Sequence, residues 1–277
     1  MNELIWLKIC PQKRLSLLSV REWLAAKELF YFLAWKEIKV RYKQTFLGVA
    51  WALLQPLLTM TLFTLLFSST FPSPAGAPYS LFALAGLIPW IYISAGVNFS
   101  STCLIGEANM IKKVHFPLIA LPLSKIFAGL LDLMISFALF LIFAMALSYP
   151  LSPKLLLFPL WMGFAFVAAA GPALYLSALT ALYRDVRYVI PFLIQVWMFA
   201  SPIAYPSTLI QEKWLSLYCL NPLVCVIELF RWMALGEPLL ALLPLSGWVL
   251  SASSTLLFFL YGLYFFRQTE LELADVL

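Results

Sequence analysis

The chain has 277 residues, of which 63% are hydrophobic and only 11% are charged, and its mean hydropathy is +0.93. Soluble domains carry about 25% charged residues, so this composition excludes an ordinary water-soluble protein and indicates one that lies in a bilayer. The net charge of +5 is not a nucleic-acid signal, because nine of the eighteen Lys and Arg residues precede the first long apolar run.

Residues 1–46 form a basic segment that contains an amphipathic pattern. Four side chains recur on one helical face, namely Tyr31, Trp35, Ile38 and Tyr42. Three lysines lie about 100° round from them, namely Lys36, Lys39 and Lys43. We therefore expect a helix over Trp23–Lys43 in the cytoplasmic membrane interface, with aromatic rings in the lipid and lysines toward the headgroups. A generic membrane anchor explains the pattern equally well.

Six apolar stretches follow, and each approaches or exceeds the roughly 20 residues that cross a hydrocarbon core. They are Leu47–Phe67, Ser80–Ser101, Leu118–Leu147, Leu155–Tyr183, Val189–Tyr205 and Pro244–Phe266. All are apolar on every side, whereas strands of a membrane barrel alternate. The sequence predicts an all-α integral membrane protein, with six transmembrane helices in residues 47–266 and a cytoplasmic tail over 267–277.

The positive charges predict the orientation of these spans. If the N-terminus is cytoplasmic, fourteen Lys and Arg residues lie on the cytoplasmic side and only three on the outside. The reverse orientation would invert this ratio, against the positive-inside rule. Both termini and the loops at Glu107–Phe116 and Arg184–Arg187 are therefore expected in the cytoplasm.

The segment from Pro206 to Leu243 has a different character. Its apolar run Trp214–Ile227 has 14 residues, which is too short to span a bilayer. We expect two short re-entrant helices that dip into the outer leaflet; a true span here would instead place the C-terminus outside. Glu228 and Arg231 are three residues apart and can pair on one helix face.

No motif of enzymatic chemistry is present, so we expect neither a catalytic residue nor a metal site. The sequence holds no phosphate-binding loop of the GxxxxGK[ST] type, no HExxH and no GxSxG, and its four cysteines lack metal-type spacing. Lys125 and Asp132 are seven residues apart on one face of the third span. We interpret Asp132 as a polar anchor toward the bundle interior, with a role in proton transfer as the alternative. Energy for transport would then come from outside this chain.

Some aromatic residues lie within or beside the predicted spans, where they could line a channel for a glycan. Aromatic faces let sugars slide without holding any one tightly, although packing or lipid contact explains each residue individually. The candidates are Trp51, Trp90, Tyr92, Trp197 and Tyr205.

Several stretches, taken in order from about Trp35 to the C-terminus, resemble the polysaccharide-export permeases among the ABC-2 type ATP-binding-cassette transporters. The first stretch, Lys39–Pro56, looks like the family's entry into its first span. The others are Asn109–Pro117, then Tyr183–Tyr188 together with Ser201–Pro206, and finally Asn221-Pro222 together with Glu228 and Arg231.

The resemblance implies a homodimer with two copies of a separate ATPase, which holds ATP and Mg²⁺, in a bacterial cytoplasmic membrane. The implied substrate is a lipid-linked glycan, such as O-antigen, capsular polymer or teichoic acid. An ATPase-coupling loop is implied at Glu107, Asn109, Lys112, Lys113, His115 and Phe116, a gate helix at Tyr31, Trp35, Lys39, Arg41 and Tyr42, and a further cytoplasmic loop at Arg184, Asp185 and Arg187.

Other interpretations stay open. Arg41 and the neighbouring lysines either attract the pyrophosphate of a lipid carrier or only anchor the chain at the headgroups. An ABC-2 exporter of a small molecule or lipid would share most of these features. A polytopic membrane transferase would need clustered catalytic groups, for which Arg184, Asp185 and Arg187 are the one compact candidate. A proton-driven carrier is disfavoured by the scarcity of buried charge.

Overall fold

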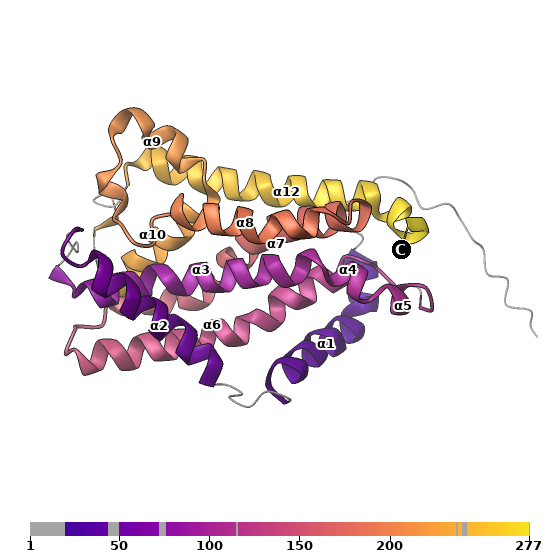
Figure 1. Ribbon diagram of the computed structural model, residues 1–277, viewed down its shortest axis with the longest axis horizontal. Helices are drawn as coiled ribbons and strands as arrows, with labels where there is room; N and C mark the ends of the chain where they lie inside the picture. Colours follow the sequence, from indigo (N-terminus) through magenta and orange to yellow (C-terminus); the bar gives the residue numbers. More distant parts are fainter. Residues whose placement is uncertain are drawn as a thin grey trace, which may run out of the picture.

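A computed structural model describes residues 20–43, 50–71, 76–114, 116–236, 238–239 and 243–276. All regular elements within these ranges are helical, as the sequence predicts. His115, and the part of the resemblance that runs from residue 44 to residue 49, lie outside the described residues. Figure 1 shows the long helices side by side along the longest axis of the molecule.

Five long apolar helices match predicted spans to within a few residues, except at the C-terminal end of the last one. They are α2 (Ala50–Phe67), α3 (Tyr79–Ser101), α6 (Ala120–Ala146), α7 (Phe158–Leu182, preceded by the 3-10 turn Pro153–Leu157) and α12 (Leu245–Val276). Helix α3 lies at the centre and most of its side chains are buried, whereas α2 packs at the periphery and exposes most of its own. Helix α12 continues unbroken through the boundary that was predicted between the last span and the tail.

The fifth span is shorter than predicted. Helix α8 covers Val186–Phe199, and its 14 residues extend about 21 Å at 1.5 Å per residue, less than the roughly 30 Å of a hydrocarbon core. The prediction of one continuous helix over Val189–Tyr205 is therefore wrong. Ser201 precedes Pro202, and a residue before proline is disfavoured in the helical region, so the chain leaves the helix there and turns.

Two short helices lie between α8 and α12, as predicted. Helices α9 (Glu212–Cys219) and α10 (Pro222–Leu235) are bent by 100° relative to each other. Asn221 sits at the bend, where its side chain accepts a hydrogen bond from the backbone of Leu223 and caps α10. In Figure 1 this pair lies at the end of the molecule opposite α1, α5 and the C-terminus.

The bend and the end of α8 support each other through side-chain hydrogen bonds. Trp197 Nε1 donates to Asn221 Oδ1 at 2.9 Å, and Asn221 Nδ2 donates to the carbonyl of Ala200 at 3.1 Å. The expected pairing of Glu228 with Arg231 is confirmed at 3.2 Å, with both side chains at most 1% exposed. Arg231 also donates to the carbonyl of Ile203, so the turn after α8 is tied to α10.

Glycines let α7 and α12 approach each other closely. A Cβ atom at Gly262 would lie 2.2 Å from the carbonyl oxygen of Gly171, a backbone atom that cannot move aside. Small residues that allow such contact are typical of packed membrane helices, where dispersion replaces the hydrophobic effect between helices.

We predict that Gly262→Ala destabilises the protein by about 1–3 kcal/mol, because α12 must shift away from α7 to admit the methyl group. Thermal unfolding of the detergent-solubilised protein measures this. The matched control is Gly163→Ala on α7, where a Cβ meets nothing within 4 Å. Equal midpoints for the two variants would contradict the close contact.

Candidate functional site

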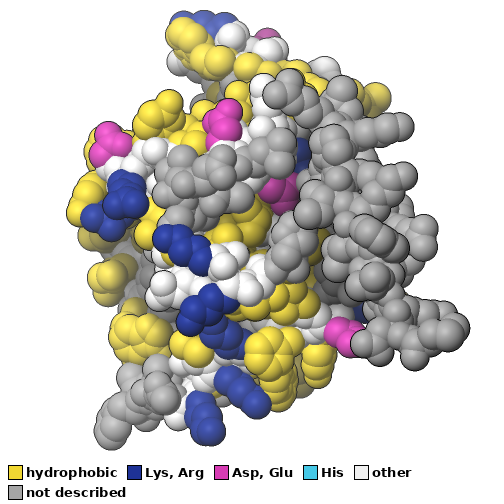
Figure 2. All heavy atoms as spheres, turned by 90° about the vertical axis from the view of Figure 1, so that its right-hand side faces the viewer, with side chains coloured by type: hydrophobic (Ala, Val, Ile, Leu, Met, Phe, Trp, Pro, Cys, Tyr) yellow, Lys and Arg dark blue, Asp and Glu magenta, His cyan; other side chains and the backbone are white. Residues whose placement is uncertain are grey.

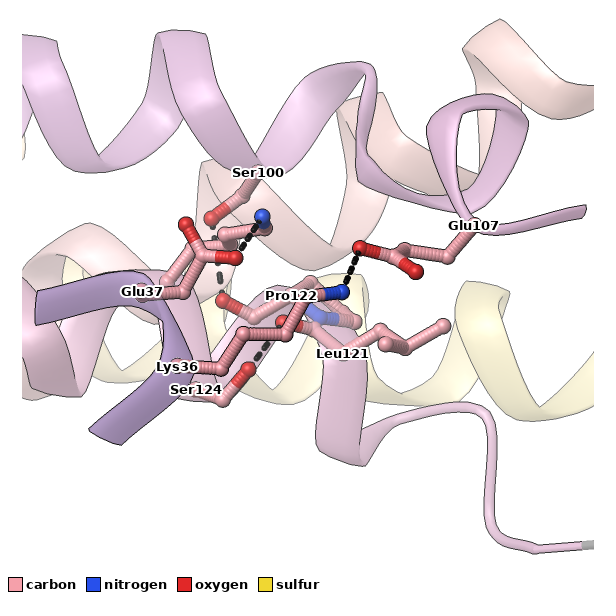
Figure 3. Close-up of polar contacts among 8 residues, drawn as sticks. Lys36, Glu37, Ser100, Glu107, Leu121, Pro122 and Ser124 are labelled. Carbon is pink, nitrogen blue, oxygen red and sulfur yellow. Dashed lines mark hydrogen bonds and ion pairs between the residues drawn. The ribbon is translucent and has the colours of Figure 1, made fainter. Parts of the chain in front are cut away.

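Helix α1 (Val20–Lys43) docks against the bundle through ion pairs that lie at one end of the molecule. Lys36 Nζ lies 2.6 Å from Glu107 Oε1, between α4 (Cys103–Gly106) and α5 (Ala108–Ile111), and Glu37 pairs with Lys125 of α6. Figure 3 shows Lys36 reaching from α1 to Glu107, with the Glu37 carboxylate beside this contact. We call the ion pairs between α1 and the bundle the α1 latch.

A third ion pair completes the α1 latch. Arg41 pairs with Asp132, and the Tyr42 hydroxyl donates to the other oxygen of that carboxylate. Lys125 and Asp132 are two helical turns apart on one face of α6, and Glu37 and Arg41 are one turn apart on one face of α1. Each of these faces carries one positive and one negative charge, and the opposite charges pair across the two helices. Asp132 is thus a polar anchor, but its partners come from α1.

The amphipathic pattern of α1 is divided between lipid-accessible and docked positions. Tyr31 and Trp35 expose 68% and 44% of their surfaces, respectively, and Lys39 lies with its Nζ 5.5 Å from the centre of the Trp35 ring. Tyr42, which the pattern places on the same stripe, is instead partly buried and bound to Asp132. The C-terminal turn of α1 therefore points its aromatic side chain into the protein.

The segment around α4 and α5 has one face on the core and one face outward. Ile111 and Phe116 pack against the core, whereas Asn109, Lys112 and Lys113 are exposed. Glu107 links the segment to α1. Cys103 is buried, and burial raises the pKa of its thiol to about 12, so the thiol stays protonated at neutral pH.

The turn between α7 and α8 presents exposed charges at the same end of the molecule. Arg184, Asp185 and Arg187 are all exposed, and Arg187 donates to the neighbouring Tyr188 hydroxyl. Figure 2, which looks onto this end, shows dark blue Lys and Arg side chains gathered there. This end is suited to bind an acidic surface or anionic headgroups.

A hollow of about 740 Å³ opens beside the α1 latch, between α1, α2, α3, α6 and α8. Its surface is mostly apolar but includes several polar side chains, and we call it the polar hollow. Its size falls within the usual range for ligand sites. Trp51 and Tyr92, two of the aromatic candidates from the sequence, line it together with Arg41 and Tyr42. The other polar lining side chains are Gln55, Ser94, Asn98, Asp132 and Ser136.

A second, apolar hollow of about 690 Å³ also lies along α8. The bend between α9 and α10 forms one wall, and Trp197 and Tyr205 line it. Ile194 of α8 faces both hollows. Trp90 is only 6% exposed and lines neither; its ring lies edge-on to Trp197 at 6.2 Å. The five aromatic candidates therefore do not form a single lining within one protomer.

Sequence reasoning did not single out several residues of this region. Glu37 carried no motif, Gln55 belonged to the stretch Lys39–Pro56 but was given no role of its own, and Asn98 lies in a long run without charges. A signal for Glu37 was nevertheless available, because Glu37 and Arg41 form a helical face whose charges complement Lys125 and Asp132. Among the described residues, no three His, Cys, Asp or Glu side chains are grouped as a metal site.

The helical bundle, the bent helix pair and the docked α1 define a multi-pass α-helical membrane protein of the transporter type. Residues 28–235 match the family of the ABC-2 type transporter, so the chain belongs to that family. It is therefore the membrane-spanning permease component, which is not itself catalytic and works with a separate ATPase.

The relatives of this chain include bacterial export permeases. It is 29% identical over 246 residues to the O-antigen export system permease protein RfbA of Myxococcus xanthus, which covers 86% of this chain and 94% of that protein. A protein of the same description from Klebsiella pneumoniae is 27% identical over 252 residues, 87% of this chain and 92% of that protein. The polysialic acid transport protein KpsM of Escherichia coli is 29% identical over 205 residues, 71% of this chain and 77% of that protein.

The α1 latch yields a charge-reversal prediction. We predict that Glu37→Lys accelerates amide hydrogen exchange in residues 27–43 about tenfold, because an unpaired, partly buried Lys125 costs about 1–3 kcal/mol. Adding Lys125→Glu restores the pair and should restore slow exchange. Hydrogen exchange of the protein in lipid nanodiscs measures both effects.

Lys39→Glu serves as the control for this series, since Lys39 is exposed on the same helix and contacts Trp35. Its exchange should stay near that of the wild type. Failure of the double variant to recover would mean that the Glu37 and Lys125 side chains do not hold α1 as a pair.

Proposed function

We propose that this chain is the permease of an ATP-driven exporter that moves a lipid-linked polysaccharide across the bacterial cytoplasmic membrane. The observation that carries the proposal is the similarity, over 86% of this chain, to a permease of O-antigen export. The polar hollow supports it, because hydroxyl-rich sugars need hydrogen-bonding groups together with an aromatic face, and this hollow offers both. The glycan is of the O-antigen, capsular or teichoic-acid type.

The functional unit we propose is a homodimer with two copies of the ATPase. One bundle of this size is small for a polymer conduit, and pairing two creates space between them. Helix α2 buries only Pro56 and Met60, and α8 exposes a row of large apolar side chains, which suits contact with a second copy as well as with lipid. ATP and Mg²⁺ bind to the partner ATPase.

Transport begins, in this proposal, with movement of the ATPases on nucleotide binding. The exposed Lys112 and Lys113 contact the ATPase, and the α4–α5 segment moves with it. Because Lys36 pairs with Glu107, α1 follows this movement and pulls on Asp132 at the wall of the polar hollow. The helices then part between the two copies, and the glycan is threaded or its lipid is flipped.

Both termini face the cytoplasm in this proposal. The end of the molecule that carries α1, α4, α5 and the end of α12 is the one where Lys and Arg gather in Figure 2. Excess Lys and Arg are typical of the cytoplasmic side. The bent pair α9–α10 then enters from the outer leaflet.

A second candidate function is export of a small apolar molecule or lipid by the same ABC-2 machinery. The apolar hollow of about 690 Å³ favours it, because its volume suits a drug-sized ligand. Polysaccharide export is preferred since the similarity to polysaccharide permeases extends over most of the chain.

Depletion of this protein in its host tests the proposed function directly. We predict that lipid-linked glycan accumulates inside the cell while the surface loses it, as measured by fractionation and glycan staining. Normal surface glycan would contradict the proposal and favour the small-molecule exporter. Loss of the polymer in both places would point to a synthetic enzyme.

The coupling role of the α4–α5 segment has its own test. We predict that Lys112→Glu combined with Lys113→Glu lowers glycan export and coupled ATP hydrolysis at least about threefold, because like charges then meet where complementary ones were. Lys213→Glu, an exposed charge reversal at the opposite end, is the control. Wild-type rates in the double variant would remove these lysines from the ATPase contact.

A further inference from the structure

The polar hollow contains a buried hydroxyl that lacks a hydrogen-bond partner among the described residues. Tyr92 is 4% exposed and lines the hollow, and among the described residues its hydroxyl has no hydrogen-bond partner. Buried polar groups are nearly always paired, because an unpaired one costs free energy when it leaves water. The Tyr92 hydroxyl therefore points to a polar ligand in this hollow.

Charged and polar groups converge near Tyr92. A Cβ atom on Gly129 of α6 would lie 3.4 Å from Tyr92 Cε2 and 4.0 Å from Arg41 Nη1, so the tyrosine ring and the guanidinium meet over this glycine. Asp132 lies one helical turn further along α6. Absence of a side chain at Gly129 thus leaves room where the three groups face one another.

The hollow also has an open aromatic face. Trp51 of α2 exposes 57% of its surface and lines the hollow. Gln55 lies one turn along the same helix, and Asn98 adds a second amide from α3. An indole face beside amide, carboxylate and guanidinium groups is the combination that suits a sugar ring, whose CH face is apolar and whose rim donates and accepts hydrogen bonds.

We propose that the polar hollow is a saccharide-binding site that holds one sugar ring of the exported glycan. Trp51 faces the apolar side of the ring, the Arg41–Asp132 pair binds its hydroxyls, and the Tyr92 hydroxyl gains the partner that it otherwise lacks. This assignment rests on the proposed function and specifies which part of the substrate the protomer recognises.

The charge of the hollow favours a neutral sugar over the diphosphate of a lipid carrier. Arg41 and Asp132 are the charged side chains in its described lining, and they pair with each other. A diphosphate would have to compete with Asp132 for Arg41 and would then lie beside that carboxylate, which is unfavourable. A sugar hydroxyl has no such conflict, because it can donate to Asp132 and accept from Arg41.

The position of the site also couples binding to the α1 latch. Arg41 and Asp132 both line the hollow and hold α1, so a sugar bound between them contacts the joint that fixes this helix. Occupancy of the hollow is thereby communicated to the helix that we propose follows the ATPase.

Binding titrations with the intact complex in lipid nanodiscs test the proposal. One probe is the lipid-linked glycan extracted from cells depleted of this permease, and the other is polyprenyl diphosphate, which carries no sugar. We expect Tyr92→Phe to weaken binding of the glycan about three- to tenfold, the value of one hydrogen bond, and to leave the diphosphate unaffected. Thermal stability should be unchanged, because the hydroxyl has no protein partner in the described structure.

Tyr264→Phe on α12, an exposed tyrosine outside both hollows, is the matched control and should bind both probes as the wild type does. Equal binding of the two probes by the wild type, or equal effects of Tyr92→Phe on both, would overturn the saccharide site. The depletion experiment tests the proposed function separately, because normal surface glycan in depleted cells would contradict that function whatever the binding titrations give.

Discussion

The arrangement of the end of the molecule that carries α1 depends on three ion pairs that hold this helix to the bundle. Lys125 and Glu37 expose only 15% and 13% of their side chains, so water screens this pair less than it would screen a surface pair. In such surroundings, loss of one partner leaves a charge that neither lipid nor protein satisfies. The α1 latch therefore fixes α1 against α6 and at the same time places Arg41 at the wall of the polar hollow.

The opposite end of the molecule follows a related constraint. The chain from Ala200 to Pro206, directly after α8, is not helical, and backbone groups within a bilayer must find partners in the protein. Tyr79 donates to the carbonyl of Ala204, Arg231 to that of Ile203 and Asn221 to that of Ala200. The turn is thus supported by side chains from α3, α10 and the bend, and this explains how α8 can end before it has crossed a full hydrocarbon core.

Together these two constraints place α8 between hollows of different chemistry. Ile194 faces both hollows, with the Arg41–Asp132 pair on one side and the Asn221 bend on the other. A polymer with sugar rings and a lipid carrier presents both polar and apolar surface. The division of the protomer into a polar and an apolar hollow is consistent with such a substrate.

Much of the fold could be predicted from the sequence, because charge-free apolar runs of sufficient length define helices such as α3 and α6. The end of α8 is harder to predict, because the run up to Tyr205 stays apolar and Pro202 alone does not decide it, since Pro191 lies inside the same helix. The side chains that support the turn, Asn221 and Arg231, come from distant positions. The α1 latch could be predicted only in part from the sequence. The spacing of Lys125 and Asp132 on one face is local, but their partners on α1 lie 88 and 91 residues away.

The aromatic candidates show the same limit. Trp51 and Tyr92 both line the polar hollow, whereas Trp90 is buried against Trp197. The sequence pattern within a single span does not show which of these aromatic residues lines a hollow and which is buried. Which face of a membrane helix meets a hollow depends on its neighbours. That information resides in the packing of the whole bundle.

Locking α1 in place tests most directly whether its movement drives export. In a variant without native cysteines, Glu37→Cys and Lys125→Cys are joined by a short, cleavable bis-maleimide, and glycan export is measured before linking, after linking and after cleavage. We predict that export stops in the linked protein and resumes when the linker is cleaved, because α1 can then again follow the ATPase. Export at an undiminished rate in fully linked protein would contradict the account.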